Sequence, residues 1–131
     1  MDSEVSQAKH ALLIEDYEDH SDRFSLTLEE NGYEVDCAYD KTKAIDKLTE
    51  VVYDLILMDI MLPELDDGLE LLDMITGDSI NAKTSVIMIS IRDDSQAINR
   101  AGSRASVFLV KPVYDEQLVR AIRKVESEHQ K

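Results

Sequence analysis

Short apolar runs recur along the chain, and four of them stop at a charged or hydroxyl side chain. The most constraining run is residues 54–58, which leads into Asp59 and shows no alternation of polar and apolar residues. A strand of this kind is buried on both faces, as are parallel strands between two layers of helices. The run therefore predicts a parallel sheet in which Asp59 ends an interior strand and faces water on one side.

Amphipathic segments separate the apolar runs, so the chain is predicted to alternate between strand and helix five times. The strands are predicted at residues 10–14, 34–39, 54–58, 85–89 and 107–110. The helices are predicted at 17–31, after the cap Asp40, after the turn 64–68, at 93–104, and along the stripe Leu118, Ala121, Ile122 and Val125. A (βα)5 alternation predicts a doubly wound α/β sandwich of three layers, with a parallel sheet and helices on both faces.

Local signals place three boundaries within this alternation. Gly32 accepts the left-handed conformation that closes a helix, so the first helix ends there. Asp40 is a favoured N-cap for the second helix. Residues 64–68, which include Asp66 and Asp67, are predicted to form a solvated turn before the third helix. The apolar face of the second helix is predicted to hold Ala44, Ile45, Leu48 and Val52.

Five polar side chains follow the marked strands. They are Glu15 and Asp16 after the first strand, Asp59 after the third, Ser90 after the fourth and Lys111 after the fifth. In doubly wound sheets the ligand site lies beyond the carboxyl ends of the strands, where the winding direction reverses. All of these residues fall on that edge. Three carboxylates, a hydroxyl and an ammonium together indicate phosphoryl transfer.

Composition limits the class of protein. A length of 131 residues fits one domain, predicted over 1–131, ordered from about residue 9 to 126 and flexible at both tails. No apolar stretch approaches the roughly 20 residues that span a bilayer, and the N-terminus lacks the pattern of a signal peptide. No membrane association is expected.

Charge and cysteine content limit the partners and the compartment. The net charge is −14, from 28 acidic and 14 basic residues, which repels nucleic-acid phosphates. Direct binding of nucleic acid is therefore not expected. The lone Cys37 cannot form an internal disulfide, which fits a reducing compartment and predicts a cytoplasmic location.

On these features the chain resembles the receiver domain of bacterial two-component response regulators, over essentially its whole length. Four motifs carry the resemblance: Glu15-Asp16, the segment from Asp59 to Pro63, Ser90, and Lys111-Pro112. Each motif is weak alone, and the specificity comes from their order on separate strand ends. The resemblance implies a flavodoxin-like fold with the strand order 2-1-3-4-5.

The resemblance also implies a chemistry. Asp59 would be the nucleophile that takes a phosphoryl group from a phosphohistidine and forms an aspartyl phosphate. Glu15, Asp16 and Asp59 would hold Mg²⁺, or Mn²⁺ in its place, with the backbone carbonyl of Met61 as a further ligand. Lys111 would pair with a phosphoryl oxygen. The chain would then be a self-phosphorylating acceptor with slow autodephosphorylation and not a turnover enzyme.

A switch belongs to the same resemblance. In the family, the hydroxyl after the fourth strand moves toward the phosphoryl group, and an aromatic side chain turns inward behind it. These positions are Ser90 and Phe108 here. Phosphorylation would remodel the surface of the fourth helix, fifth strand and fifth helix. The implied partners are a sensor histidine kinase or histidine phosphotransfer protein, a downstream protein or appended output domain, and a second copy in a phosphorylation-dependent dimer.

Several positions depart from the family pattern. Ile91 stands where a small residue usually follows the hydroxyl, and the turn after Pro63 is one residue longer than usual. Arg104 replaces the Gly that commonly ends the fourth helix, and the nearest Gly is Gly102. These departures predict an unusual output surface and leave the phosphoacceptor residues intact.

The residues two beyond the aspartate and two beyond the hydroxyl tune hydrolysis in the family, and here they are Met61 and Arg92. Met61 cannot orient a water molecule through a carboxylate or amide. The phosphoryl group is therefore predicted to last for minutes or longer.

Two other functions stay open on the sequence. A pseudo-receiver that binds proteins without phosphorylation is favoured by Ile91 and the altered fourth helix. The other is a Mg²⁺-dependent phosphatase with an aspartyl nucleophile. Such enzymes usually carry a second acid two residues beyond the nucleophile, and Met61 at that position argues against this function. Each motif taken singly also has a structural explanation: acids at a helix start, a strand-end hydroxyl, and a lysine and proline that terminate a strand.

Overall fold

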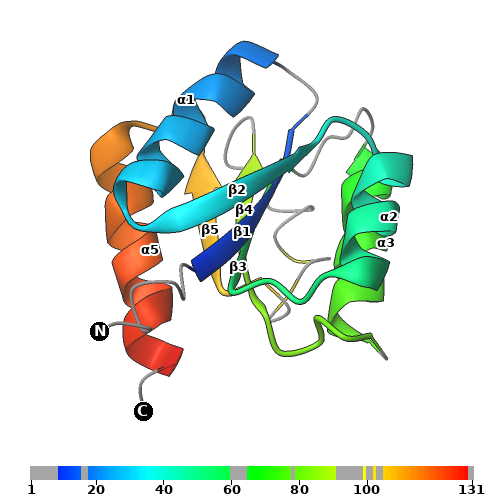
Figure 1. Ribbon diagram of the computed structural model, residues 1–131. Coiled ribbons are helices and arrows are strands. Elements are labelled where there is room, and N and C mark those ends of the chain that lie inside the picture. Colours follow the sequence, from blue (N-terminus) through cyan, green and yellow to red (C-terminus); the bar gives the residue numbers. More distant parts are fainter. Residues whose placement is uncertain are drawn as a thin grey trace.

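The computed structural model contains a five-stranded sheet between two layers of helices (Figure 1). It describes residues 9–15, 18–59, 65–77, 79–90, 99, 102 and 105–129. The elements are β1 (Lys9–Ile14), α1 (Glu18–Glu30), β2 (Tyr33–Ala38), α2 (Lys41–Glu50), β3 (Leu55–Asp59), α3 (Leu65–Thr76), β4 (Ser85–Ser90), β5 (Val107–Val110) and α5 (Asp115–His129). The strands are parallel and lie in the order β2-β1-β3-β4-β5. The predicted fold class and strand order are confirmed.

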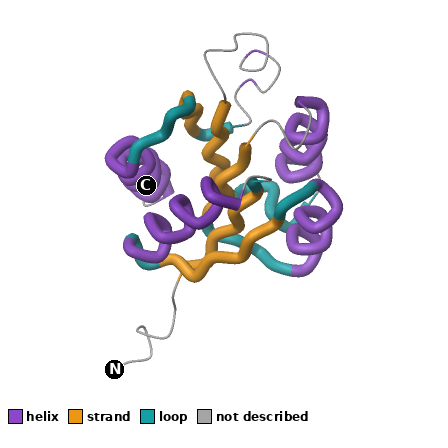
Figure 2. Tube along the Cα trace, turned by 90° about the horizontal axis from the view of Figure 1, so that it is seen from above, coloured by secondary structure: helices purple, strands orange, loops and turns teal. Residues whose placement is uncertain are grey.

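Helices cover both faces of the sheet, with α1 and α5 on one side and α2 and α3 on the other (Figures 1 and 2). Alternate residues of a strand therefore enter different cores. In β1, Leu12 and Ile14 pack in the core with α2 and α3, whereas Ala11 and Leu13 pack in the core with α1 and α5. Burial on both sides explains why the interior strands are continuously apolar.

The central strand β3 is buried along its whole length, including its last residue Asp59. Its register with β4 runs from Leu55 opposite Ser85 to Asp59 opposite Ile89. The strand thus begins and ends one residue later than predicted. Asp59 is held by the sheet itself and does not sit in the loop beyond it.

Two predicted boundaries are confirmed. Gly32 follows α1 with a φ of +94°, the left-handed region that favours glycine. The side chain of Asp40 accepts the backbone N–H of Lys43 at 2.8 Å and caps α2. A cap of this kind satisfies one of the N–H groups that a helix start leaves without a partner.

Two local predictions are wrong. Val52 does not belong to the apolar face of α2, because the backbone becomes extended at Val51 (φ −127°, ψ 135°) and leaves Val52 63% exposed. Asp66 and Asp67 do not form a turn, because α3 already begins at Leu65. Acidic residues are favoured in the first turn of a helix, where the helix dipole is positive.

The predicted fourth helix lies mostly outside the described residues, although Asn99 within it is helical. The last helix α5 reaches His129 and so includes residues that the sequence had placed in a flexible tail. Among the described helices, none is long and apolar enough to cross a lipid bilayer.

Candidate functional site

The carboxyl ends of β1, β3 and β5 bring Glu15, Asp59 and Lys111 to the same edge of the sheet. Ile14 of β1 pairs with Met58 of β3. The residues that follow them, Glu15 just past β1 and Asp59 at the end of β3, therefore lie side by side. The backbone N–H of Glu15 donates to the carbonyl of Ala38 in β2 at 3.1 Å, which fixes the chain just past β1. The position of both carboxylates therefore follows from the register of the sheet.

Lys111 contacts both of these carboxylates. Its Nζ lies 2.6 Å from Oδ2 of Asp59 and 3.6 Å from Oε2 of Glu15. The side chains of Glu15 and Asp59 are 1% and 4% exposed, and that of Lys111 is 18% exposed. Two buried carboxylates side by side repel each other, and the ammonium offsets that repulsion.

This arrangement suits a reaction of the Asp59 carboxylate with an incoming anionic group. The carboxylate ends a buried strand, so the sheet fixes its position before any reactant arrives. The ammonium of Lys111 lies within reach of a group that approaches Asp59, so it can stabilise negative charge on that group. The site thus combines a positioned carboxylate with a positioned cation.

The same edge suits a hard divalent cation. Glu15 and Asp59 are oxygen donors of the type that Mg²⁺ prefers, and one ammonium leaves the pair with a net negative charge. Within the described residues, no three carboxylate, imidazole or thiol side chains gather as a metal site. Asp16, the third predicted carboxylate, lies outside that part of the chain.

The other residues singled out in the sequence differ in how far the structure describes them. Met61 and Arg92 lie outside the described residues, as do Ile91 and Arg104. Ser90 is the last residue of β4, and its backbone pairs with Val110 of β5, but its side chain is not described. Phe108 lies on β5, is half-buried, and packs against the core beneath α2 and α3.

One neighbour of the site was not predicted. A cavity of about 280 Å³ lies beside Lys111 and is lined by Arg23, Phe24, Pro112 and Val113. Phe24 lies on the buried face of α1, and no local pattern in the sequence marks Arg23 as part of a site. The docking of α1 beside the loop after β5 decides that both residues border the site, and no local pattern encodes that docking.

The sequence of the chain matches one family of known proteins. Residues 11–123 match the family model of the response regulator receiver domain. The response regulator ArlR of Staphylococcus saprophyticus is 34% identical over 113 residues, which is 86% of this chain and 50% of ArlR. The chain thus spans about half the length of the curated relatives it matches.

Solved structures show the same fold. A signal receiver domain from Clostridium thermocellum superposes with a TM-score of 0.83 at 26% identity, covering 89% of this chain and 96% of that one. TrrA from Thermotoga maritima, solved in complex with Mg²⁺-BeF, has a TM-score of 0.75 at 24% identity over 89% and 98% of the two chains. The family match, the sequence relatives and the strand-end residues agree, and the chain belongs to the response regulator receiver domain family.

Proposed function

We propose that Asp59 accepts a phosphoryl group from the phosphohistidine of a sensor histidine kinase or histidine phosphotransfer protein. The observation that carries the proposal is the position of Lys111, whose Nζ contacts both Asp59 and Glu15 at the carboxyl edge of the sheet. Receiver domains act as phosphoacceptors and not as turnover enzymes, and the proposal assigns that role to this residue.

In the proposed step, a carboxylate oxygen of Asp59 attacks the phosphorus of the phosphohistidine. The new O–P bond forms as the P–N bond breaks, and the electron pair of that bond passes to the imidazole nitrogen, which takes a proton. Lys111 exchanges its contact with the unphosphorylated carboxylate of Asp59 for one with a phosphoryl oxygen. Ser90 is proposed to donate its hydroxyl to another phosphoryl oxygen.

The proposed metal ligands are Glu15, Asp16 and Asp59, with the backbone carbonyl of Met61. The burial of Glu15 and Asp59 beside one ammonium supports this set, because the net charge favours a further cation. Mg²⁺, or Mn²⁺ in its place, would offset charge on the phosphoryl oxygens.

The proposed readout is a change of the surface formed by β5, α5 and the segment before β5. Its support is the half-buried position of Phe108 on β5, three residues before Lys111, where its side chain packs against the core beneath α2 and α3. Because relatives of the chain are about twice as long, an output domain or downstream protein is part of the proposal. A phosphorylation-dependent dimer is a separate part of the proposal. So are a single domain over 1–131 and a cytoplasmic location, which a lone Cys37 supports.

The test is incubation with Mg²⁺ and acetyl phosphate, followed by intact mass measurement. The wild-type chain is expected to gain one phosphoryl group, and Asp59→Ala is expected to abolish the gain. Asp54→Ala removes the aspartate just before the opposite end of β3 and serves as the matched control, which keeps the adduct. A wild-type chain that gains no phosphoryl group and binds no Mg²⁺ is a pseudo-receiver, and the proposal is then wrong.

The lifetime of the adduct is a separate expectation that rests on Met61 and Arg92. Isolated phosphoprotein in Mg²⁺ is expected to keep its phosphoryl group for minutes or longer. Loss of the adduct within seconds would contradict this expectation and leave the identity of the acceptor untouched.

A further inference from the structure

The opposite edge of the sheet carries a second concave site. A pocket of about 410 Å³ lies where β1, β2 and β3 begin, and it is lined by Lys9, Tyr33, Val52, Tyr53, Asp54, Ile80, Lys83, Thr84, Val125 and Glu126. Asp54 directly precedes β3, and Asp59 ends it. The five residues of β3, at about 3.3 Å each, separate the two sites by about 16 Å.

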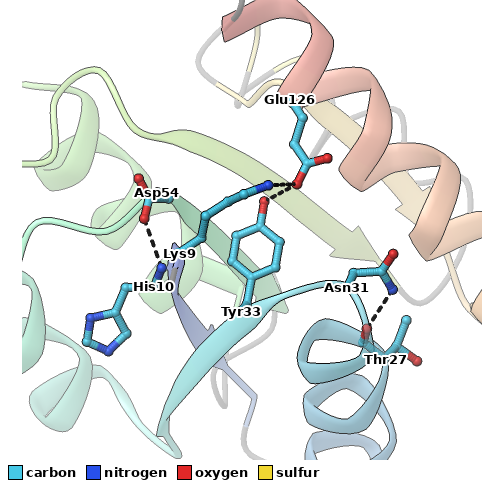
Figure 3. Close-up of polar contacts among 7 residues, drawn as sticks. All are labelled: Lys9, His10, Thr27, Asn31, Tyr33, Asp54 and Glu126. Carbon is cyan, nitrogen blue, oxygen red and sulfur yellow. Dashed lines mark hydrogen bonds and ion pairs between the residues drawn. The ribbon is translucent and has the colours of Figure 1, made fainter. Parts of the chain in front are cut away.

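Ion pairs and hydrogen bonds hold the walls of this pocket in place (Figure 3). Glu126 of α5 accepts from Nζ of Lys9 at 2.7 Å and from the hydroxyl of Tyr33 at 2.7 Å. Asp54 accepts the backbone N–H of His10 at 2.8 Å. These contacts join α5 to β1 and β2, and β1 to the start of β3. The pocket is therefore preformed.

Two apolar side chains border the pocket and remain in water. Val52 is 63% exposed and Ile80 is 53% exposed. Single exposed apolar residues need no explanation, but here two of them stand at the rim of one concavity with tyrosine and valine walls. The surface thus has two projecting apolar side chains, Val52 and Ile80, beside a recess lined by Tyr33, Tyr53 and Val125.

The charge of this surface differs from that of the whole chain. The chain carries a net charge of −14, whereas the pocket has two lysines, Lys9 and Lys83, against two acids, Asp54 and Glu126, and sums to zero. Two copies of the chain repel each other over most of their surface, and the repulsion is weakest where the local charge cancels. A strongly acidic or basic partner would find no net charge to pair with here.

We propose that this surface docks a second copy of the chain in a two-fold symmetric dimer. Symmetry requires a self-complementary patch, and this one combines recess with projection and positive with negative charge. Val52 and Ile80 of each copy would enter the pocket of the other, and Lys83 of each copy would pair with Asp54 of the other. The interface lies at the edge of the sheet opposite Asp59 and forms without phosphorylation, so it does not rest on the proposed function.

The interface is expected to be weak. Ten residues line the pocket, whereas a standard interface uses about 20–30 residues on each side. The dimer should therefore exchange quickly with the monomer and grow with protein concentration. That dependence is what the first experiment measures.

The first test is sedimentation velocity of the unphosphorylated chain over a concentration series in metal-free buffer. The wild-type chain and Asp59→Asn are expected to shift equally from monomer toward dimer. Val52→Asp and Ile80→Asp are expected to weaken dimerisation at least about tenfold, because a carboxylate would enter an apolar recess. Leu26→Asp is the matched control, since Leu26 is 56% exposed on α1 and lines no part of this pocket.

The second test uses charge reversal. Lys83→Glu and Asp54→Lys each place like charges opposite each other and should dimerise at least about tenfold more weakly than wild type. An equal mixture of the two restores both opposite-charge pairs and should dimerise more tightly than either variant alone. Because Asp54→Lys loses the bond to His10, its folding is checked by circular dichroism, and Asp54→Asn replaces it in the mixture if it does not fold.

Three results would overturn the proposal. A wild-type chain that stays monomeric throughout the concentration series overturns the dimer. A dimer that survives Val52→Asp and Ile80→Asp, or a mixture no tighter than Lys83→Glu alone, places the interface elsewhere and overturns this assignment.

Discussion

At the scale of single residues, Lys111 lies beside two buried carboxylates. Its ammonium compensates Glu15 and Asp59, both of which are almost wholly buried. Removing one partner of a buried ion pair leaves a charge without compensation, which costs more than the pair itself contributes. Lys111 should therefore support stability as well as chemistry.

Lys111→Met is expected to lower the free energy of unfolding by about 3 kcal/mol at neutral pH, because two buried carboxylates lose their cation. Urea denaturation measures the change. Lys43→Met, which removes an exposed lysine of α2, is the control and should change stability little. Asp59→Asn should cost less than Lys111→Met, since Glu15 still pairs with Lys111. Equal stability of Lys111→Met and wild type would contradict this account.

Glu126 gives a pH dependence at the opposite edge of the sheet. Burial raises the pKa of Glu126. Hydrogen bonds from Lys9 and Tyr33, together with the charges of Lys9 and Arg123, lower this pKa by more than burial raises it. The net pKa therefore lies below its ordinary value of 4.5. A lowered folded-state pKa stabilises the fold above the ordinary value, and this stabilisation is lost as the pH falls through the folded-state pKa.

Glu126→Gln is therefore expected to be less stable than wild type at neutral pH, with the difference shrinking below pH 4.5. Urea denaturation at several pH values measures it. Glu128→Gln, an exposed glutamate of the same helix, should show a smaller difference at every pH. If the difference in free energy of unfolding between wild type and Glu126→Gln is the same at every pH, the glutamate acts only through packing.

At the scale of elements, Asn81 joins α2 to the start of β3. Its side chain is 1% exposed. Its amide Nδ2 donates to the carbonyls of Leu48 at 3.0 Å and Val51 at 2.8 Å, and its Oδ1 accepts the N–H of Tyr53 at 2.8 Å. The last carbonyls of a helix have no partner within the helix, and this amide supplies one. No local sequence pattern marks Asn81 for this role.

Asn81→Ala is expected to lower the free energy of unfolding by about 3 kcal/mol, because three buried backbone groups lose a partner and each net bond contributes about 1 kcal/mol. Thermal or urea unfolding measures the loss. The matched control is Asn31→Ala, where a half-buried amide makes one bond to the carbonyl of Thr27 and the expected cost is about 1 kcal/mol (Figure 3). Equal costs for the two variants would argue against the proposed role of Asn81.

At the scale of the whole molecule, the net charge of −14 works against the compact state. Salt weakens this repulsion most strongly between exposed charges that are more than about 10 Å apart at 0.1 M ionic strength. A divalent cation bound at Glu15 and Asp59 would add to screening, because it binds the folded chain and has no preformed site in the unfolded one. The two effects can be separated at matched ionic strength.

Both NaCl and MgCl2 are expected to raise the free energy of unfolding. At equal ionic strength MgCl2 should add more, by about 2.7 kcal/mol when Mg²⁺ is at a hundred times its dissociation constant. Glu15→Gln should remove most of the extra gain, and Glu34→Gln, which changes an exposed acid of β2, should keep it. A chelator should reverse the gain. Equal effects of the two salts on wild type would contradict a metal site.

The order of the elements was predictable because hydrophobic periodicity is a local property. Unbroken apolar runs indicated interior parallel strands, and Gly32 and Asp40 marked helix ends through their own backbone chemistry. Errors arose where a residue lay at the end of a periodic segment. Val52 continues the helical spacing in the sequence, but the backbone turns at Val51 to reach β3. Val52 therefore lies in the extended segment that leads into β3, although its spacing in the sequence is helical.

The sequence by itself determined which residues end the strands, and hence which groups could meet at one edge of a parallel sheet. Only the tertiary structure decided that Lys111 lies 2.6 Å from Asp59, 52 positions away, that Asn81 closes the end of α2, and that Lys9, Tyr33 and Glu126 frame a pocket at the far edge. Such contacts depend on strand register and helix docking. Both are set by packing among residues distant in the chain, and local periodicity carries no information about them.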